Sequence, residues 1–254
     1  MHQLLHLVFE VLAFIVGYAY YTRQRERSGD PIADEGRMWI IIGAAAGAFL
    51  GSRILGALER PDLLAWDLHA IFHAFNNRTI VGGLLGGLIG VELTKKWLGV
   101  HQRSGDLFVF PILLGMAIGR IGCALGGLED NTFGIATDLP WGIDLGDGVR
   151  RHPTNLYEIA WLACIWGVLL LIERKWTLVP GARFSIFMVL YLEYRFIVEF
   201  IKPGVPWAFG VTAIQWAAEL GVLYYWKVWT RPGDLVQGSG RTSPTENAAQ
   251  RNSA

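Results

Sequence analysis

Long apolar segments alternate with short polar segments along almost the whole chain. Seven of the apolar segments contain about 17 or more residues with few charges, which is the length that an α-helix needs to cross the hydrocarbon core of a membrane. They comprise residues 4–21, 38–58, 79–98, 107–125, 156–172, 184–200 and 209–229. The pattern therefore predicts an all-α, polytopic integral membrane protein with seven transmembrane helices.

The segment 63–75 is also apolar, but it is too short to cross a membrane. Asp67, His69 and His73 interrupt it. A short segment of this kind is typical of an interfacial or re-entrant piece. We therefore expect it to lie at the membrane surface, between the second and third spans.

Lysine and arginine are distributed unequally between the two sets of loops. Fourteen of them lie in the first, third and fifth loops and in the C-terminal segment, whereas five lie in the opposite loops. Cytoplasmic loops of membrane proteins carry the excess of basic residues. With seven spans, this bias predicts an N-terminus outside the cytoplasm and a C-terminus inside it.

The composition excludes other classes of protein. Charged residues make up 17% of the 254 residues, below the roughly 25% of a soluble domain, and hydrophobic residues make up 52%. The many aromatic residues argue against a disordered chain, and two cysteines cannot form a disulfide framework of this size. Twenty-two basic and twenty-two acidic residues cancel, so no global field attracts nucleic acid.

The same pattern predicts the domain organisation. Residues 1–230 form the transmembrane domain, and the loop at about residues 126–155 is the longest one on the outer side. Residues 231–254 are rich in small and polar residues, which is typical of a disordered cytoplasmic tail. A long polar loop beside charged spans is where a functional site is expected.

Glycines recur at helical spacing in two of the spans. Gly43, Gly47 and Gly51 follow one another at every fourth residue, and the third span contains five glycines. Small residues at this spacing let helix backbones approach closely in a membrane. In the third span the doubled glycines, which include Gly82 and Gly83, could instead form a strip that admits a lipid chain or head group.

Several ionisable side chains fall inside the predicted spans or at their ends. Each costs about 3 kcal/mol or more in hydrocarbon, so it usually has a partner or a task. In the sixth span, Tyr191, Arg195 and Glu199 are four residues apart and share one helix face. The others are Glu10 in the first span, Arg53 at the end of the second and Arg120 in the fourth.

The three arginines favour a site for an anion. Arg195 and Glu199 alone could be an intrahelical ion pair, but Arg53 and Arg120 have no acidic residue at helical spacing. A planar guanidinium binds phosphate through two parallel hydrogen bonds. Because phospholipid head groups are the abundant anions at membrane depth, the arginines indicate a phospholipid-handling site.

Four motifs occur in a fixed order along the chain. They are GRIG at residues 119–122, TDLPWGI at 137–143, RHPTNLYE at 151–158 and RFIVEF at 195–200. In this order and spacing, the chain resembles the prolipoprotein diacylglyceryl transferases of bacterial inner membranes. The resemblance runs from the first span to the last, where Gln215 matches the family's glutamine.

The resemblance implies an activity and a location. Members move the diacylglyceryl group of phosphatidylglycerol to the thiol of a lipobox cysteine in a preprolipoprotein, and they use no metal or organic cofactor. The implied partners are phosphatidylglycerol, the lipobox peptide and membrane lipids, with no nucleic acid, and the implied state is a monomer. The location would be the bacterial inner membrane, with a periplasmic N-terminus and the loop 126–155 in the periplasm.

The resemblance also implies roles for individual residues. Arg120 matches an essential arginine that clamps phosphate, Arg195 and Glu199 match a charged pair, and Tyr191 matches a tyrosine one turn earlier. Pre-placed arginines would stabilise the charge that the leaving glycerol phosphate gains in the transition state. The expected substrate-binding residues are Arg120, Arg53, Gly82, Gly83, Gly134, Glu129, His152, Tyr157 and Glu10.

The chain departs from the family at several of these positions. Val81 stands where the family has a histidine that is a candidate base for the thiol, and Cys123 replaces the asparagine of the GRxGN motif. A thiol with a pKa of about 8.5 is only a few per cent thiolate at neutral pH, so loss of a base slows the reaction. His73 or Glu10 could replace the base.

Two further hypotheses compete with the transferase. A non-catalytic phospholipid-binding or lipid-transport protein on the same scaffold is favoured by Val81. An ion channel or solute carrier is disfavoured, because the chain lacks internal repeats beyond its glycines.

Overall fold

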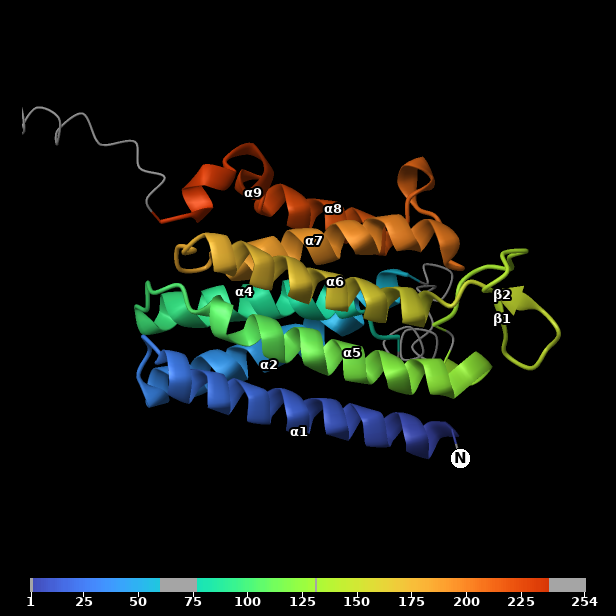
Figure 1. Ribbon diagram of the computed structural model, residues 1–254, viewed down its shortest axis with the longest axis horizontal. Helices are drawn as coiled ribbons and strands as arrows, with labels where there is room; N and C mark the ends of the chain where they lie inside the picture. Colours follow the sequence, from blue (N-terminus) through green and yellow to red (C-terminus); the bar gives the residue numbers. More distant parts are fainter. Residues whose placement is uncertain (1, 60–76, 131, 238–254) are drawn as a thin grey trace, which may run out of the picture.

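The computed structural model describes residues 2–59, 77–130 and 132–237, and these residues form a bundle of nearly parallel and antiparallel helices (Figure 1). The long helices are α1 (His2–Ser28), α2 (Asp34–Leu58), α4 (Ile80–Leu98), α5 (Val109–Gly126), α6 (Thr154–Lys175), α7 (Ala182–Val198) and α8 (Ala213–Tyr224). The short helices and strands are η2 (Gly105–Phe108), η3 (Gly127–Asp130), β1 (Ile143–Asp144), β2 (Arg150–Arg151), η4 (Glu199–Ile201), η5 (Ala208–Gly210), α9 (Lys227–Thr230) and η6 (Pro232–Leu235).

The all-α class expected from the sequence is confirmed. A long helix occupies each of the seven predicted spans, and the described chain holds only one small sheet, the antiparallel pair of β1 and β2. Judged by length and composition, three segments of the described chain could cross a membrane, namely Asp34–Leu58, Gly105–Gly126 and Thr154–Lys175. The seven-span topology as a whole stays a prediction.

The outer surface of the bundle is apolar. Large hydrophobic side chains are exposed on most of the long helices, among them Phe14 on α1, Trp97 on α4, Ile197 on α7 and Leu223 on α8. Exposed apolar surface of this extent marks contact with a membrane or another apolar partner rather than with water. The apolar exterior of the bundle is therefore consistent with the membrane protein that the sequence predicts.

The two glycine strips pack against each other between α2 and α4. A Cβ atom on Gly47 would lie 2.3 Å from the carbonyl oxygen of Gly86, and one on Gly82 would lie 2.3 Å from that of Gly51. The close approach explains the spacing of these glycines, because no side chain fits between the backbones. The packing interpretation is thus confirmed for this pair of helices, and Gly82 itself faces the backbone of α2.

The last long helix is shorter than the predicted span 209–229. Thr212 and Gln215 form a capping box, so α8 begins at Ala213, and Phe209 before it has a positive φ of 61°. Gln215 also donates a hydrogen bond of 3.0 Å from Nε2 to the carbonyl of Phe196 and so ties α8 to α7. The helix ends at Tyr224, and α9 follows as a separate turn.

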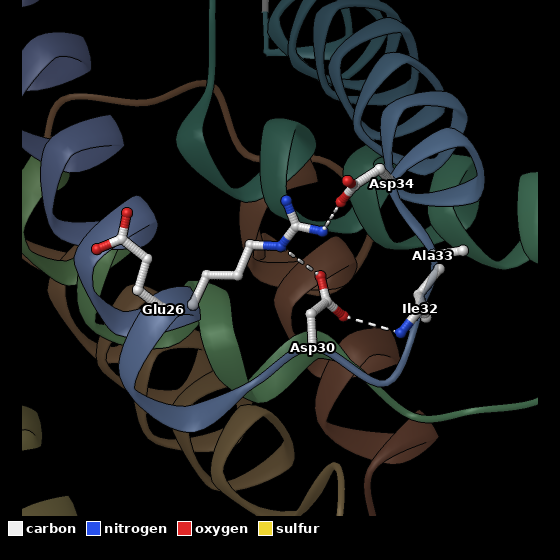
Figure 2. Close-up of a pocket in the computed structure, with 6 residues that line it drawn as sticks. Glu26, Asp30, Ile32, Ala33 and Asp34 are labelled. Atoms are coloured by element: carbon white, nitrogen blue, oxygen red, sulfur yellow. Dashed lines mark hydrogen bonds and ion pairs between the residues drawn. The ribbon is translucent and has the colours of Figure 1, made fainter.

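A buried cluster of charges fixes the turn between α1 and α2. Arg37, which is 2% exposed, forms an ion pair with Asp30 and donates a hydrogen bond to Ser104. Arg25 donates to Asp30 and Asp34, and these side chains surround a small surface hollow (Figure 2). Burial acts to raise the pKa of Asp30, but the hydrogen bond from Arg37 and the Ile32 amide outweigh it and hold that pKa below its usual value.

The chain continues to pack beyond residue 230, where the tail was expected to begin. Val179 donates a backbone hydrogen bond to Leu235, and Gln237 donates one to Thr177, so residues 235–237 lie along the α6–α7 turn. The start of the expected tail is therefore part of the folded unit. Residues 238–254, like the predicted interfacial segment 63–75 with His73, lie outside the described residues.

The glycine packing yields a stability prediction. We expect Gly47→Ala to lower the free energy of unfolding in detergent by about 1–3 kcal/mol, because the added methyl group meets the backbone of α4. Gly167→Ala in α6 is the matched control, since a Cβ there meets nothing within 4 Å, and it should stabilise by about 0.5–1 kcal/mol. Equal thermal stability of the two variants would contradict the assigned packing.

Candidate functional site

Two arginines from different helices converge on one carboxylate. Arg120 of α5 donates from Nη2 to Glu158 Oε2 at 2.9 Å, and Arg195 of α7 donates from Nη1 to the same oxygen at 3.3 Å. Glu158 stands on the second turn of α6, so three helices contribute to the cluster. The sequence predicted that the two arginines share a site, and the structure brings them together.

The rest of this cluster lies along one face of α7. Tyr191 donates its hydroxyl to Glu158 Oε1 at 2.7 Å, and Arg195 Nη2 donates to Glu199 Oε2 at 3.0 Å. Tyr191, Arg195 and Glu199 are all buried, as are Arg120 and Glu158. We call Arg120, Glu158, Tyr191, Arg195 and Glu199 the arginine cluster.

The arginine cluster is formally neutral but retains hydrogen-bond donors. Two guanidinium groups face two carboxylates, yet Arg120 Nε and Arg195 Nε are buried without a hydrogen-bond partner among the described residues. A buried unpaired donor costs about 1–3 kcal/mol. Such donors on two neighbouring guanidinium groups suit an incoming anion, which would accept the bonds that the cluster leaves open.

The Arg195–Glu199 ion pair expected on one helix is present, but it is not isolated. Arg195 also bonds Glu158 across the bundle, so the intrahelical pair is one edge of a larger network. The hydroxyl of Tyr191 is engaged by Glu158 rather than by Arg195. Tyr191 and Arg195 therefore meet at Glu158, and Glu199 joins the network through Arg195.

The cluster lies at the end of the bundle that carries the β1–β2 hairpin (Figure 1). Arg120 is near the last turn of α5, Glu158 near the first turn of α6 and Glu199 directly after α7. The start of α1 lies at this end too, whereas the α1–α2 turn and α9 lie at the other (Figure 1). We call this end the hairpin end.

Gly134 lies where the loop between α5 and α6 approaches the end of α7 and η4. Its amide donates to the His152 carbonyl at 2.9 Å, and the next amide donates to the Ile201 carbonyl at 2.8 Å. A Cβ on Gly134 would lie 2.6 Å from the Cβ of His152 and 2.7 Å from the oxygen of Ile201. Glycine is needed because the loop approaches η4, which begins with Glu199, too closely for a side chain.

Aromatic and charged side chains hold the remainder of that loop. Tyr157 accepts a hydrogen bond from Trp141 Nε1 at 2.7 Å, and its hydroxyl lies 3.3 Å from His152 Nδ1. Arg151 forms two 2.7 Å hydrogen bonds with Asp147, which hold the pKa of that carboxyl at about 2. His152 and Tyr157 thus contact each other, and the backbone of His152 is bonded to Gly134 and Ile135 in the same loop.

Other expected site residues make different contacts. Glu10 on α1 lies 3.9 Å from Arg78, just before α4, and Arg53 lies over the ring of Phe49 on its own helix. Gly83 packs loosely against α2, and the side chain of Val81 is fully buried in the core. The side chain of Glu129 and the whole of His73 lie outside the described residues.

Two ionisable residues near the cluster were missed in the sequence. Glu59 directly follows α2, and Lys202 directly follows η4. Each lies just after a predicted span, on the same predicted side of the membrane, and that shared position was the signal available in the sequence. Both lie close enough to Arg195 for its positive charge to act to lower their pKa values.

Comparisons with known proteins agree with these motifs. The family described as Prolipoprotein diacylglyceryl transferase matches residues 6–229. A phosphatidylglycerol–prolipoprotein diacylglyceryl transferase of Geobacter sulfurreducens is 30% identical over 207 residues, which cover 76% of this chain and 75% of that protein. One from Campylobacter lari, with the same name, is 27% identical over 235 residues, which cover 87% and 82%.

The geometry predicts that the central carboxylate stabilises the fold. We expect Glu158→Gln to lower the free energy of unfolding by about 3–5 kcal/mol, because it leaves two buried guanidinium groups without their shared counter-charge. Arg120→Met should cost less in the Glu158→Gln background than in the parent chain, and a thermal-denaturation double-mutant cycle measures the difference. Additive effects would show that the two groups do not interact.

Proposed function

Because the chain belongs to the prolipoprotein diacylglyceryl transferase family, we propose that it transfers the diacylglyceryl group of phosphatidylglycerol to the thiol of a lipobox cysteine in a preprolipoprotein. The sulfur forms a thioether with the glyceryl carbon, and glycerol phosphate leaves. The observation that carries this proposal is the convergence of Arg120 and Arg195 on Glu158 with an unpaired Nε on each guanidinium.

The proposed chemistry follows from the charge that develops on the leaving group. A phosphodiester carries one negative charge, and cleavage of its carbon–oxygen bond adds a second to the departing phosphate. Arg120 and Arg195 are held before the substrate arrives, so their donors need no reorganisation as that charge grows. Glu158 and Glu199 position the two guanidinium groups, and Tyr191 in turn orients Glu158.

The remaining expected residues are proposed to bind the substrates around the cluster. Gly134, His152 and Tyr157 shape the loop at the hairpin end, from which a peptide would approach. Arg53, Gly83, Glu10 and Glu129 complete the proposed lipid-binding set, whereas Gly82 packs against the backbone of α2 and is left out of it. No metal or organic cofactor is part of the proposed reaction, since the arginines supply the positive charge at the leaving group.

We propose a monomeric, seven-span protein of the bacterial inner membrane, with the N-terminus and the loop 126–155 in the periplasm and the C-terminus in the cytoplasm. The opposite positions of the start of α1 and of α9 in the bundle support an odd number of crossings (Figure 1). The transferase domain comprises residues 1–230, and the packed residues up to Gln237 adjoin it.

A second candidate is a phospholipid-binding or lipid-transport protein that performs no transfer. The observation that favours it is Val81, a fully buried core residue at the position where the family has a histidine. Both candidates bind phosphatidylglycerol at the arginine cluster. They differ in whether a lipobox peptide leaves the reaction with a diacylglyceryl group.

The test is mass spectrometry of a lipobox peptide after incubation with the purified chain in phosphatidylglycerol vesicles. We expect a diacylglyceryl adduct, and we expect Arg120→Ala to lower its rate of formation by about 100-fold or more, because a preorganised donor to the leaving group is lost. Arg183→Gln is the control, since Arg183 lies at the opposite end of the helix that holds Arg195.

Two outcomes would contradict the transferase. Bound phosphatidylglycerol without any adduct between about pH 6 and 9 would favour the second candidate. An adduct formed equally well by Arg120→Ala would show that the arginine cluster is not the reacting site.

A further inference from the structure

The transfer as described needs an acceptor for the proton of the incoming thiol. Both carboxylates of the arginine cluster are engaged: Glu158 accepts from Arg120, Arg195 and Tyr191, and Glu199 accepts from Arg195. Both carboxylates therefore already serve as hydrogen-bond acceptors and counter-charges for guanidinium groups. Val81 has no titratable group, and Glu10 faces Arg78. We therefore expect the acceptor of the thiol proton to lie next to the cluster.

Glu59 is a carboxylate at the hairpin end with a different environment. It directly follows α2, and its Oε1 accepts a hydrogen bond of 3.0 Å from the backbone N–H of Ile214 in the first turn of α8. It makes no ion pair with any other residue in ranges 2–59, 77–130 and 132–237. Its carboxylate is thus positioned but not neutralised.

The last turn of α2 places Glu59 next to the start of α4. A Cβ on Gly56 would lie 2.3 Å from the carbonyl oxygen of Asn77, and one on Gly82 would lie 2.8 Å from the Cβ of Leu55. Leu55, one turn before Glu59, and Val81 belong to the same core cluster. The end of α2 that carries Glu59 therefore packs against the start of α4 that carries Val81, the position where the titratable family residue is missing.

The charges around Glu59 suit proton exchange near neutrality. Burial, followed by the negative charge of Glu199, raises the pKa of Glu59 to about 7, against the opposing effects of the Ile214 amide, Lys202 and Arg195. Burial and the positive charge of Arg195 lower the pKa of Lys202 to about 8. A general base works best when its pKa lies near the operating pH.

We propose that Glu59 is the general base of the reaction, which accepts the proton of the lipobox thiol. This inference rests on the proposed function. The S–H proton passes to the Glu59 carboxylate, the sulfur electron pair forms the bond to the glyceryl carbon, and the carbon–oxygen bond breaks with its electrons on the phosphate. Protonated Glu59 then returns its proton to the departing phosphate or to water, and the charge balances.

The substitution Glu59→Gln separates a base from a structural role. The amide oxygen of glutamine can still accept from the Ile214 N–H, but it takes up no proton. We expect kcat/KM for a cysteine lipobox peptide to fall by about 100-fold or more, the size of a general-base contribution. We expect the parent chain to lose activity below about pH 7, where Glu59 becomes protonated, and we expect Glu59→Gln to lack this acidic limb.

A second acceptor peptide distinguishes the loss of a base from the loss of a structural contact. With selenocysteine in place of the lipobox cysteine, the nucleophile is already ionised at neutral pH and needs no base. We expect Glu59→Gln to transfer to this peptide at a rate within about 5-fold of the parent chain. Glu59→Asp should keep an acidic limb with the cysteine peptide at a lower rate, and Glu219→Gln on the exposed face of α8 should match the parent chain in all assays.

Each outcome has one meaning for the proposal. Equal losses with both peptides, at unchanged thermal stability, would assign Glu59 a structural role and overturn it. So would an unchanged rate or an unchanged pH profile in Glu59→Gln. If Glu59→Gln does not fold, Glu59→Asp must keep the acidic limb, and its absence overturns the proposal. Absence of any transfer by the parent chain would instead refute the proposed function.

Discussion

One carboxylate organises the reacting end of this protein. Glu158 accepts hydrogen bonds from two guanidinium groups and a phenol that come from α5 and α7, and all of these groups are buried. Without that shared counter-charge, two positive groups would face each other in a medium of low dielectric constant, where repulsion is strong. The two Nε donors that the cluster leaves open depend on this balance, because it holds both guanidinium groups in place.

The glycine packing of α2 and α4 also helps to position groups at this end of the bundle. Because these helices touch along their backbones, the end of α2 is fixed relative to the start of α4 with little freedom for side-chain rearrangement. Glu59 is held at that junction and bonded to α8. A rigid, apolar scaffold thereby positions charged groups that would otherwise avoid the membrane interior.

Much of this arrangement could be predicted from the sequence, and the reasons for the exceptions are physical. Long apolar segments predicted the helices, and arginines without an acid at helical spacing predicted a shared anion site, although Arg53 does not join Arg120 and Arg195 in the structure. The periodicity could not locate the helix break before Ala213, which a capping box sets. Nor could it distinguish Glu59 from any polar residue that ends a span, because its significance arises from burial and from neighbours distant in sequence.

The cluster of charges at the turn between α1 and α2 has a consequence for membrane insertion. Thirteen residues of chain contain all four of its side chains, Arg25, Asp30, Asp34 and Arg37. Their ion pairs can therefore form as soon as α1 and α2 have left the ribosome. The groups that meet at Glu158 are separated by up to 75 positions and need later helices. The ion pairs between α1 and α2 would thus form early during membrane insertion and fix the orientation of the nascent chain. The arginine cluster would form last.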